Sequence, residues 1–154
     1  MFRRMFAARD DSTIVVRLDD TMRDLLVRVS EELREVLLVN DPETTKRLYP
    51  TAYPDDEELE SDYQEMVHDQ LLMQRLDALD TFQATINDEA ISIDDADAWM
   101  STINQVRLVL GTQLDVGEDE SAIDEDDPEA HSKVIYQVLS HILEELTHAR
   151  IRSL

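Results

Sequence analysis

The amino-acid sequence predicts a mainly α-helical protein in which four long helices form a bundle-like single domain beside a short N-terminal β-hairpin. Apolar residues recur at spacings of three and four along four long segments, which is typical of amphipathic helices. A short β-branched run precedes them, which is typical of a strand. A chain of 154 residues is long enough for one hydrophobic core and too short for two ordinary ones. Residues 1–154 are therefore predicted to form one domain.

In the N-terminal part of the chain, a strand-like pattern of residues gives way to helical spacing. The β-hairpin is predicted over residues 1–18, because the β-branched run Thr13–Leu18 follows an apolar segment across a polar turn. From there the helical spacing takes over, and a helix is predicted over residues 19–40. Asp19 or Asp20 can serve as its N-cap, since a carboxylate there accepts hydrogen bonds from free amides of the first turn.

Three further helices are predicted over residues 57–86, 94–114 and 129–151, with an acidic loop over residues 115–128. The second of the four helices carries a stripe at helical spacing that we expect to face the core. This stripe consists of Leu59, Tyr63, Met66, Val67, Gln70, Met73, Leu76 and Leu79.

The charge is strongly acidic but unevenly distributed. Thirty-six acidic residues against 14 basic ones give a net charge of −22, which repels nucleic-acid phosphates overall and is also typical of proteins adapted to salt. Half of the basic residues lie in the first 38, where seven arginines face eight acids. Contacts with DNA or another anion are therefore predicted in this N-terminal quarter, through Arg3, Arg4, Arg9, Arg17, Arg23 and Arg28.

The composition argues against several classes of protein. Without cysteine there is no disulfide, thiolate metal site or cysteine nucleophile. Two glycines leave no glycine-rich phosphate loop, and there is no nucleophile-elbow motif. No apolar segment is long enough for a signal peptide or a membrane span. We expect a cytoplasmic protein that is not an enzyme, has no cofactor and does not contact a membrane.

A helical-bundle metal-binding protein is the alternative from a different class. Glu65 and His68 form one Glu-x-x-His pair, and Glu145 and His148 form another, as in di-iron bundles. Such a site also needs a carboxylate from each of the other two helices, and the segment Ala98–Leu114 has none. The sequence therefore favours surface pairs of Glu and His over a metal site.

Polar residues inside an apolar helix are a second cluster of interest. Arg107 lies in an otherwise apolar run, one turn after Asn104, so we expect it to be partly buried. We interpret it as the partner of Asp55 or Asp56, which would hold the loop that contains Tyr49 and Tyr53. A ligand or partner site is the alternative interpretation. Tyr49 and Tyr53 are expected to fix this loop.

Two motifs carry a family resemblance. Leu-Tyr-Pro-x-Ala-Tyr at residues 48–53 and Asn-x-x-Arg-Leu-Val-Leu-Gly at residues 104–111 resemble an actinobacterial family of helical proteins. Some of its members carry the label AosR, an oxidative-stress transcriptional regulator. The resemblance extends over nearly the whole chain. It implies a cytoplasmic regulator from a family often encoded beside the ClpS proteolysis adaptor, with redox-responsive DNA binding proposed for some members.

Together these observations predict an AosR-like regulatory protein that acts through protein contacts, with DNA binding through the N-terminal quarter. A plain interaction adaptor linked to proteolysis or transcription is the alternative. A protein partner is expected in both cases, and the sequence leaves a homodimer open.

Overall fold

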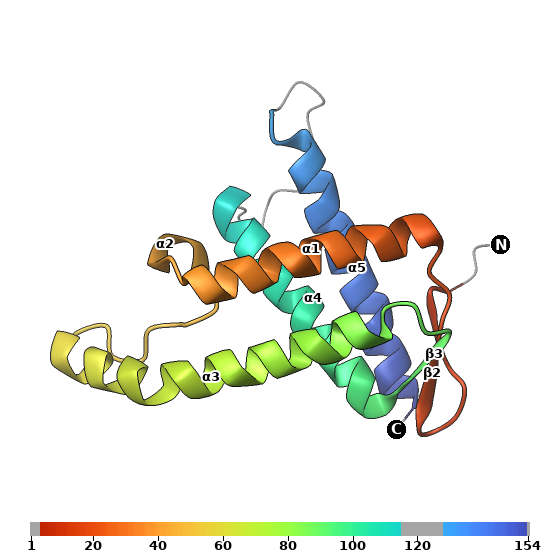
Figure 1. Cartoon of the computed structure of the whole chain (residues 1–154), viewed down its shortest axis with the longest axis horizontal. Helices are drawn as coiled ribbons and strands as arrows, with labels where there is room; N and C mark the ends of the chain where they lie inside the picture. The colour runs from red at the N-terminus through yellow and green to blue at the C-terminus, as the bar shows by residue number, and fades with distance from the viewer. Residues whose placement is uncertain (1–3, 115–127, 154) are drawn as a thin grey trace.

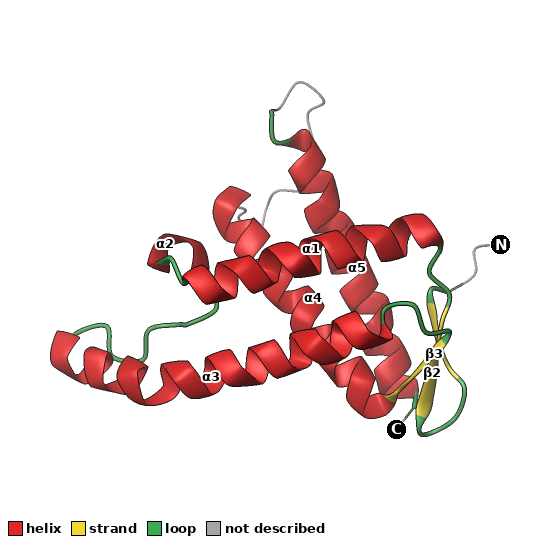
Figure 2. Cartoon of the chain, in the orientation of Figure 1, coloured by secondary structure: helices red, strands yellow, loops and turns green. Residues whose placement is uncertain are grey.

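The structure, a computed structural model, describes residues 4–114 and 128–153 and confirms the predicted fold class (Figures 1 and 2). The helices are α1 (Asp20–Val39), α2 (Pro42–Thr45), α3 (Glu57–Thr85), α4 (Ile93–Leu114) and α5 (Ala130–Arg152). The strands are β1 (Phe6–Ala8), β2 (Thr13–Val16) and β3 (Ala90–Ser92). The bounds of the four long helices differ from the predicted ones by at most one residue. The predicted acidic loop lies outside the described residues apart from Pro128.

Helix α4 is the centre of the bundle. It packs against α5, α3, α1 and α2, and Figure 1 shows α1 and α3 running side by side across it. Its fully buried Trp99 contacts two aromatic rings edge-on, that of Phe82 at 4.9 Å and that of Phe6 at 6.2 Å between centroids. The indole N–H donates to the hydroxyl of Thr85 at 2.7 Å, so the one polar atom of the ring is satisfied. Trp99 thus joins α4 to α3 and to the sheet.

The sheet has three antiparallel strands in the order β1-β2-β3, one more than predicted. The expected hairpin pairs Phe6 with Val16, and β3 adds a pair between Ile14 and Ile91. Both isoleucines are buried, so β3 is held in place by burial as well as by its hydrogen bonds. A three-residue strand directly before a helix has no periodicity of its own, which explains why the sequence did not indicate it.

The ends of α1 follow local sequence rules. The carboxylate of Asp19, and not that of Asp20, accepts a hydrogen bond from the amide of Met22 at 2.8 Å. At the other end Asn40 adopts a left-handed conformation, with φ of 55°, and its amide donates to the carbonyl of Val36. This left-handed residue stops α1 and turns the chain into the short helix α2. Among the described residues, no helix is both long and apolar enough to cross a bilayer.

Arg23 is buried on the first turn of α1 and corrects one of the sequence predictions. Its guanidinium donates to the backbone carbonyls of Val16 and Leu18, beside the start of α1. It also donates to the carbonyls of Ile86, at 2.5 Å, and Asp88, between α3 and β3. Because its donors are already used within the fold, Arg23 is unavailable as a contact for DNA or another anion.

Replacement of Arg23 by methionine should destabilise the fold by about 3 kcal/mol or more, since several buried carbonyls lose a charged donor. Unfolding in urea followed by circular dichroism measures the change. Arg17→Met is the matched control, because Arg17 is exposed one residue after β2, and it should cost no more than about 0.5 kcal/mol. Equal losses in the two variants would contradict the structural role of Arg23.

Candidate functional site

The loop between α2 and α3 is fixed to α3 through Tyr49. On one side of its ring lies the guanidinium of Arg75, 4.6 Å from the centroid, and the same guanidinium donates to the carbonyl of Leu48. The imidazole of His68 also packs against the ring, with 4.4 Å between the centroids. His68 is also hydrogen bonded to the side chain of Asn40 at 3.2 Å. Tyr49 therefore fixes the loop, held by two side chains of α3.

Arg107 does not hold this loop, so that part of the sequence interpretation is wrong. Its guanidinium is partly buried, as expected, but it donates to Asn104 on its own helix at 3.1 Å. Asp56 instead caps α3, accepting from the amide of Leu59 at 3.1 Å, and Asp55 is exposed. The loop is held by α3, which follows it directly in the chain and supplies Arg75, whereas Arg107 of α4 bonds within its own helix.

Glu60 makes the second attachment of the loop to α3. One carboxylate oxygen accepts from the amides of Ala52, at 2.7 Å, and Tyr53, at 2.9 Å, and the other accepts from Gln64. The hydrogen bonds from Gln64, Tyr53 and Ala52 lower the pKa of Glu60 from its ordinary value of 4.5, although burial opposes them. Tyr53 also packs edge-on against Tyr63 of α3, at 5.9 Å between centroids.

With its inner face attached in this way, α3 turns a row of apolar side chains toward solvent. Leu59, Met66 and Met73 are 48%, 78% and 66% exposed. They are spaced seven residues apart, close to two helical turns, so they form one line along the helix. On the opposite side of the helix, His68, Arg75, Leu79 and Phe82 contact the rest of the protein. Glu60 and Tyr63, between the two sides, contact the loop, and Asp80, seven residues after Met73, pairs with Arg34 of α1 at 2.6 Å. We call Leu59, Met66 and Met73 the outer stripe.

The outer stripe was expected to face the core, and that expectation is wrong for these three residues. Leu79, from the same predicted set, is fully buried. At about 100° per residue, Leu79 lies on the side of the helix opposite Met66. Helix α3 therefore carries two apolar faces, and only packing decides which one is buried.

Acidic residues border the outer stripe. Asp62, Asp69 and Asp77 follow Leu59, Met66 and Met73 by three or four residues, which puts each of them next to the stripe. All three are exposed, and none forms an ion pair within the part of the chain that the structure describes. The N-terminal half of α3 extends past the other helices at one end of the molecule (Figure 1). The surface is thus apolar, negatively charged and accessible.

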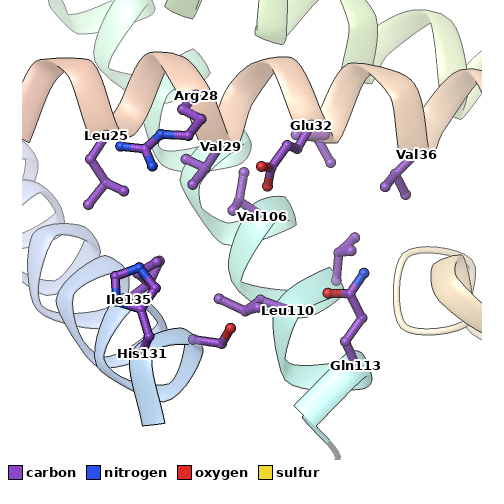
Figure 3. A pocket seen from close by; sticks show the side chains of 13 residues that line it. Leu25, Arg28, Val29, Glu32, Val36, Val106, Leu110, Gln113, His131 and Ile135 are labelled. Carbon is purple, nitrogen blue, oxygen red and sulfur yellow. The ribbon is translucent and has the colours of Figure 1, made fainter. Parts of the chain in front are cut away.

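A second accessible feature is a groove of about 320 Å³ between α1, α4 and α5 (Figure 3). Its walls are apolar, with Val29 of α1, Val106 of α4 and Ile135 of α5 among them. Arg28, Glu32, Gln113, His131 and Ser132 supply its polar groups. The volume suits a small ligand. Because the groove carries charges of both signs, its electrostatics select no class of ligand.

The two Glu-x-x-His pairs do not meet. Glu65 and His68 lie on the projecting half of α3, whereas Glu145 and His148 lie near the C-terminal end of α5, at the other end of the molecule (Figure 1). Glu145 pairs with His141 at 3.1 Å. No group of three or more potential metal ligands comes together within residues 4–114 and 128–153.

The predicted anion contacts are dispersed. Arg4 lines a small cavity with Glu145, His148 and Arg152 of α5, so a carboxylate lies beside these basic residues. The exposed Arg9 lies in the connection between β1 and β2, the exposed Arg17 follows β2, and Arg28 borders the groove on α1. Arg3 lies outside the described residues. DNA contact through Arg4, Arg9, Arg17 and Arg28 stays a prediction.

Glu60 makes the attachment of the loop dependent on pH. Because its folded-state pKa is lowered, its contribution to stability is present above pH 4.5 and is lost as the pH falls through the lowered pKa. Hydrogen exchange of the Ala52 and Tyr53 amides should accelerate, relative to other exposed amides, over that range. Glu60→Ala should show the fast exchange already at neutral pH, whereas Glu60→Gln keeps an acceptor oxygen and should protect both amides without this pH dependence. Equal protection in the native chain and Glu60→Ala would contradict the attachment.

Comparison with known proteins gives the family of the chain without an activity. Neither the curated proteins nor the solved structures yielded a match. A family model described as a domain of unknown function, DUF2017, matches residues 2–150. This range includes the three strands and the five helices of the described residues, except the last two residues of α5. The chain therefore belongs to the DUF2017 family.

Proposed function

We propose that this protein is a regulatory protein that works by binding another protein, and that the outer stripe of α3 is its contact surface. The observation that supports this proposal most directly is that three large apolar side chains lie in one exposed line on a helix that is attached to the loop and the bundle. Exposed apolar surface of this kind costs solubility and marks interaction sites when it is contiguous. Methionine adds to the argument, because its flexible and polarisable side chain suits contact surfaces that accept different partners.

The partner element that fits is a basic amphipathic helix of another protein. Residues two turns apart match the spacing of apolar residues along a facing helix. Asp62, Asp69 and Asp77 beside the stripe attract lysines and arginines that flank the apolar residues of that helix. A second copy of α3 fits poorly, because the helix carries eight acidic residues and, apart from His68, a single basic residue, Arg75. A homodimer through the outer stripe would thus place like charges together.

This proposal keeps the regulatory role that the AosR-like resemblance implies and gives it a physical basis in protein contacts without catalysis. An adaptor that links its partner to proteolysis or transcription would use the same surface. The acidity then has a specific use around α3, in addition to keeping the rest of the surface hydrated.

Binding can be measured with the full-length protein and a labelled model peptide. The peptide is helical, with leucines at seven-residue spacing and lysines beside them, and fluorescence anisotropy reports its affinity. We expect the affinity to fall with added salt and to fall about tenfold or more in the double variant Met66→Ser/Met73→Ser, since each buried methionine contributes about 1.5–3 kcal/mol.

The matched control replaces two exposed apolar residues elsewhere. Val134→Ser/Ile151→Ser changes side chains of α5 that are 46% and 59% exposed, and it should leave the affinity unchanged. A peptide with glutamates in place of the lysines should bind at least tenfold more weakly than the basic one. Equal binding of the two peptides, or equal losses in the two double variants, would overturn the proposal.

A further inference from the structure

Two methionines are far more accessible than the others that the structure describes. Met66 and Met73 are 78% and 66% exposed, on the outer stripe. Met5, Met22 and Met100 are partly buried and pack against the hydrophobic core. The chain has no cysteine to react in their place. A soluble oxidant therefore meets the thioethers of Met66 and Met73 before those of Met5, Met22 and Met100, because susceptibility follows exposure.

From this placement we propose that Met66 and Met73 are sites of reversible oxidation to methionine sulfoxide, and that oxidation releases the partner bound at the outer stripe. The inference rests on the proposed function of that surface. The oxidant class is a hydroperoxide, with hydrogen peroxide as the simplest example. The sulfur lone pair attacks one peroxide oxygen, so that the S–O bond forms while the O–O bond breaks. The departing hydroxide takes the proton from the transferred oxygen and leaves as water. The sulfur is oxidised by two electrons and the peroxide is reduced.

The consequence for docking follows from polarity. Each sulfoxide puts a strong hydrogen-bond acceptor on the outer stripe, opposite the apolar residues of the docked helix, and those apolar side chains offer it no donor. Leu59 alone then remains as an unmodified apolar residue of the stripe. The negative border is unchanged, so oxidation removes the apolar contribution to binding and leaves the electrostatic one.

Partner binding and oxidation oppose each other. A docked helix covers both thioethers, so the free protein is the form that reacts. Saturation with the basic peptide should therefore slow the oxidation of Met66 and Met73 without changing that of Met22 and Met100. This protection distinguishes a functional site from simple surface damage. If the peptide bound at another surface, the oxidation rates of Met66 and Met73 would not change.

The test uses the folded full-length chain and hydrogen peroxide, quenched with catalase. Peptide mapping by mass spectrometry should show Met66 and Met73 gaining one oxygen each at least tenfold faster than Met22 and Met100. The affinity for the basic peptide should fall about tenfold or more. Treatment with methionine sulfoxide reductases A and B, with a dithiol such as dithiothreitol as the two-electron reductant, should restore it, with the sulfoxide oxygen leaving as water. Met66→Leu/Met73→Leu keeps the surface apolar without a thioether, so this variant should bind normally and resist peroxide.

The outcomes separate the two proposals. If the untreated protein fails to bind the basic peptide, the proposed function is wrong, whatever the oxidation map shows. If it binds but keeps its affinity after Met66 and Met73 are oxidised, the oxidation inference alone is wrong. A loss of binding in the peroxide-treated leucine variant would also overturn it, because the effect would then come from other residues.

Discussion

The buried guanidinium of Arg23 is the constraint on which the arrangement of sheet and helices depends. It donates to four backbone carbonyls from two chain segments that are more than 60 residues apart. One segment runs from the end of β2 to the start of α1, and the other connects α3 to β3. Because planar donors require carbonyls in fixed directions, Arg23 also sets how α1 leaves the sheet. The C-terminal half of α3 is fixed by this junction and by Trp99. Its N-terminal half is consequently positioned by the loop that Tyr49 and Glu60 attach.

Two kinds of apolar surface on one helix explain how α3 serves both fold and contact. Toward the core, Leu79 and Phe82 are buried against the bundle, while Arg75 and His68 contact the ring of Tyr49. On the opposite side, no described element of the protein covers the outer stripe, and its residues are exposed. The loop contacts His68 and Arg75 on the inner face and Glu60 and Tyr63 beside it, which leaves Met66 and Met73 accessible to a partner.

Local rules were sufficient to predict the long helices. Helical periodicity, the N-cap at Asp19 and Pro42, two residues after Asn40, each depend on residues that are close together in the sequence. The positions of Arg23, β3 and Arg107 depend on distant chain segments, which a local pattern does not contain. Arg23 looks like an exposed arginine until Ile86 and Asp88 supply acceptors. The outer stripe shows the same limit in the candidate site, since Leu59, Met66 and Met73 have a normal core spacing. Only the competing face with Leu79 and Phe82 turns them outward.

The small cavity shared by Arg4, His148 and Arg152 places the two ends of the described chain side by side. Figure 1 shows both ends on the side of the molecule opposite the projecting half of α3. A domain, surface or label joined at either terminus would therefore be attached at one pole while the outer stripe remains at the other. Such a tethered molecule would present its contact helix outward, and two different attachments could be made at once without blocking it.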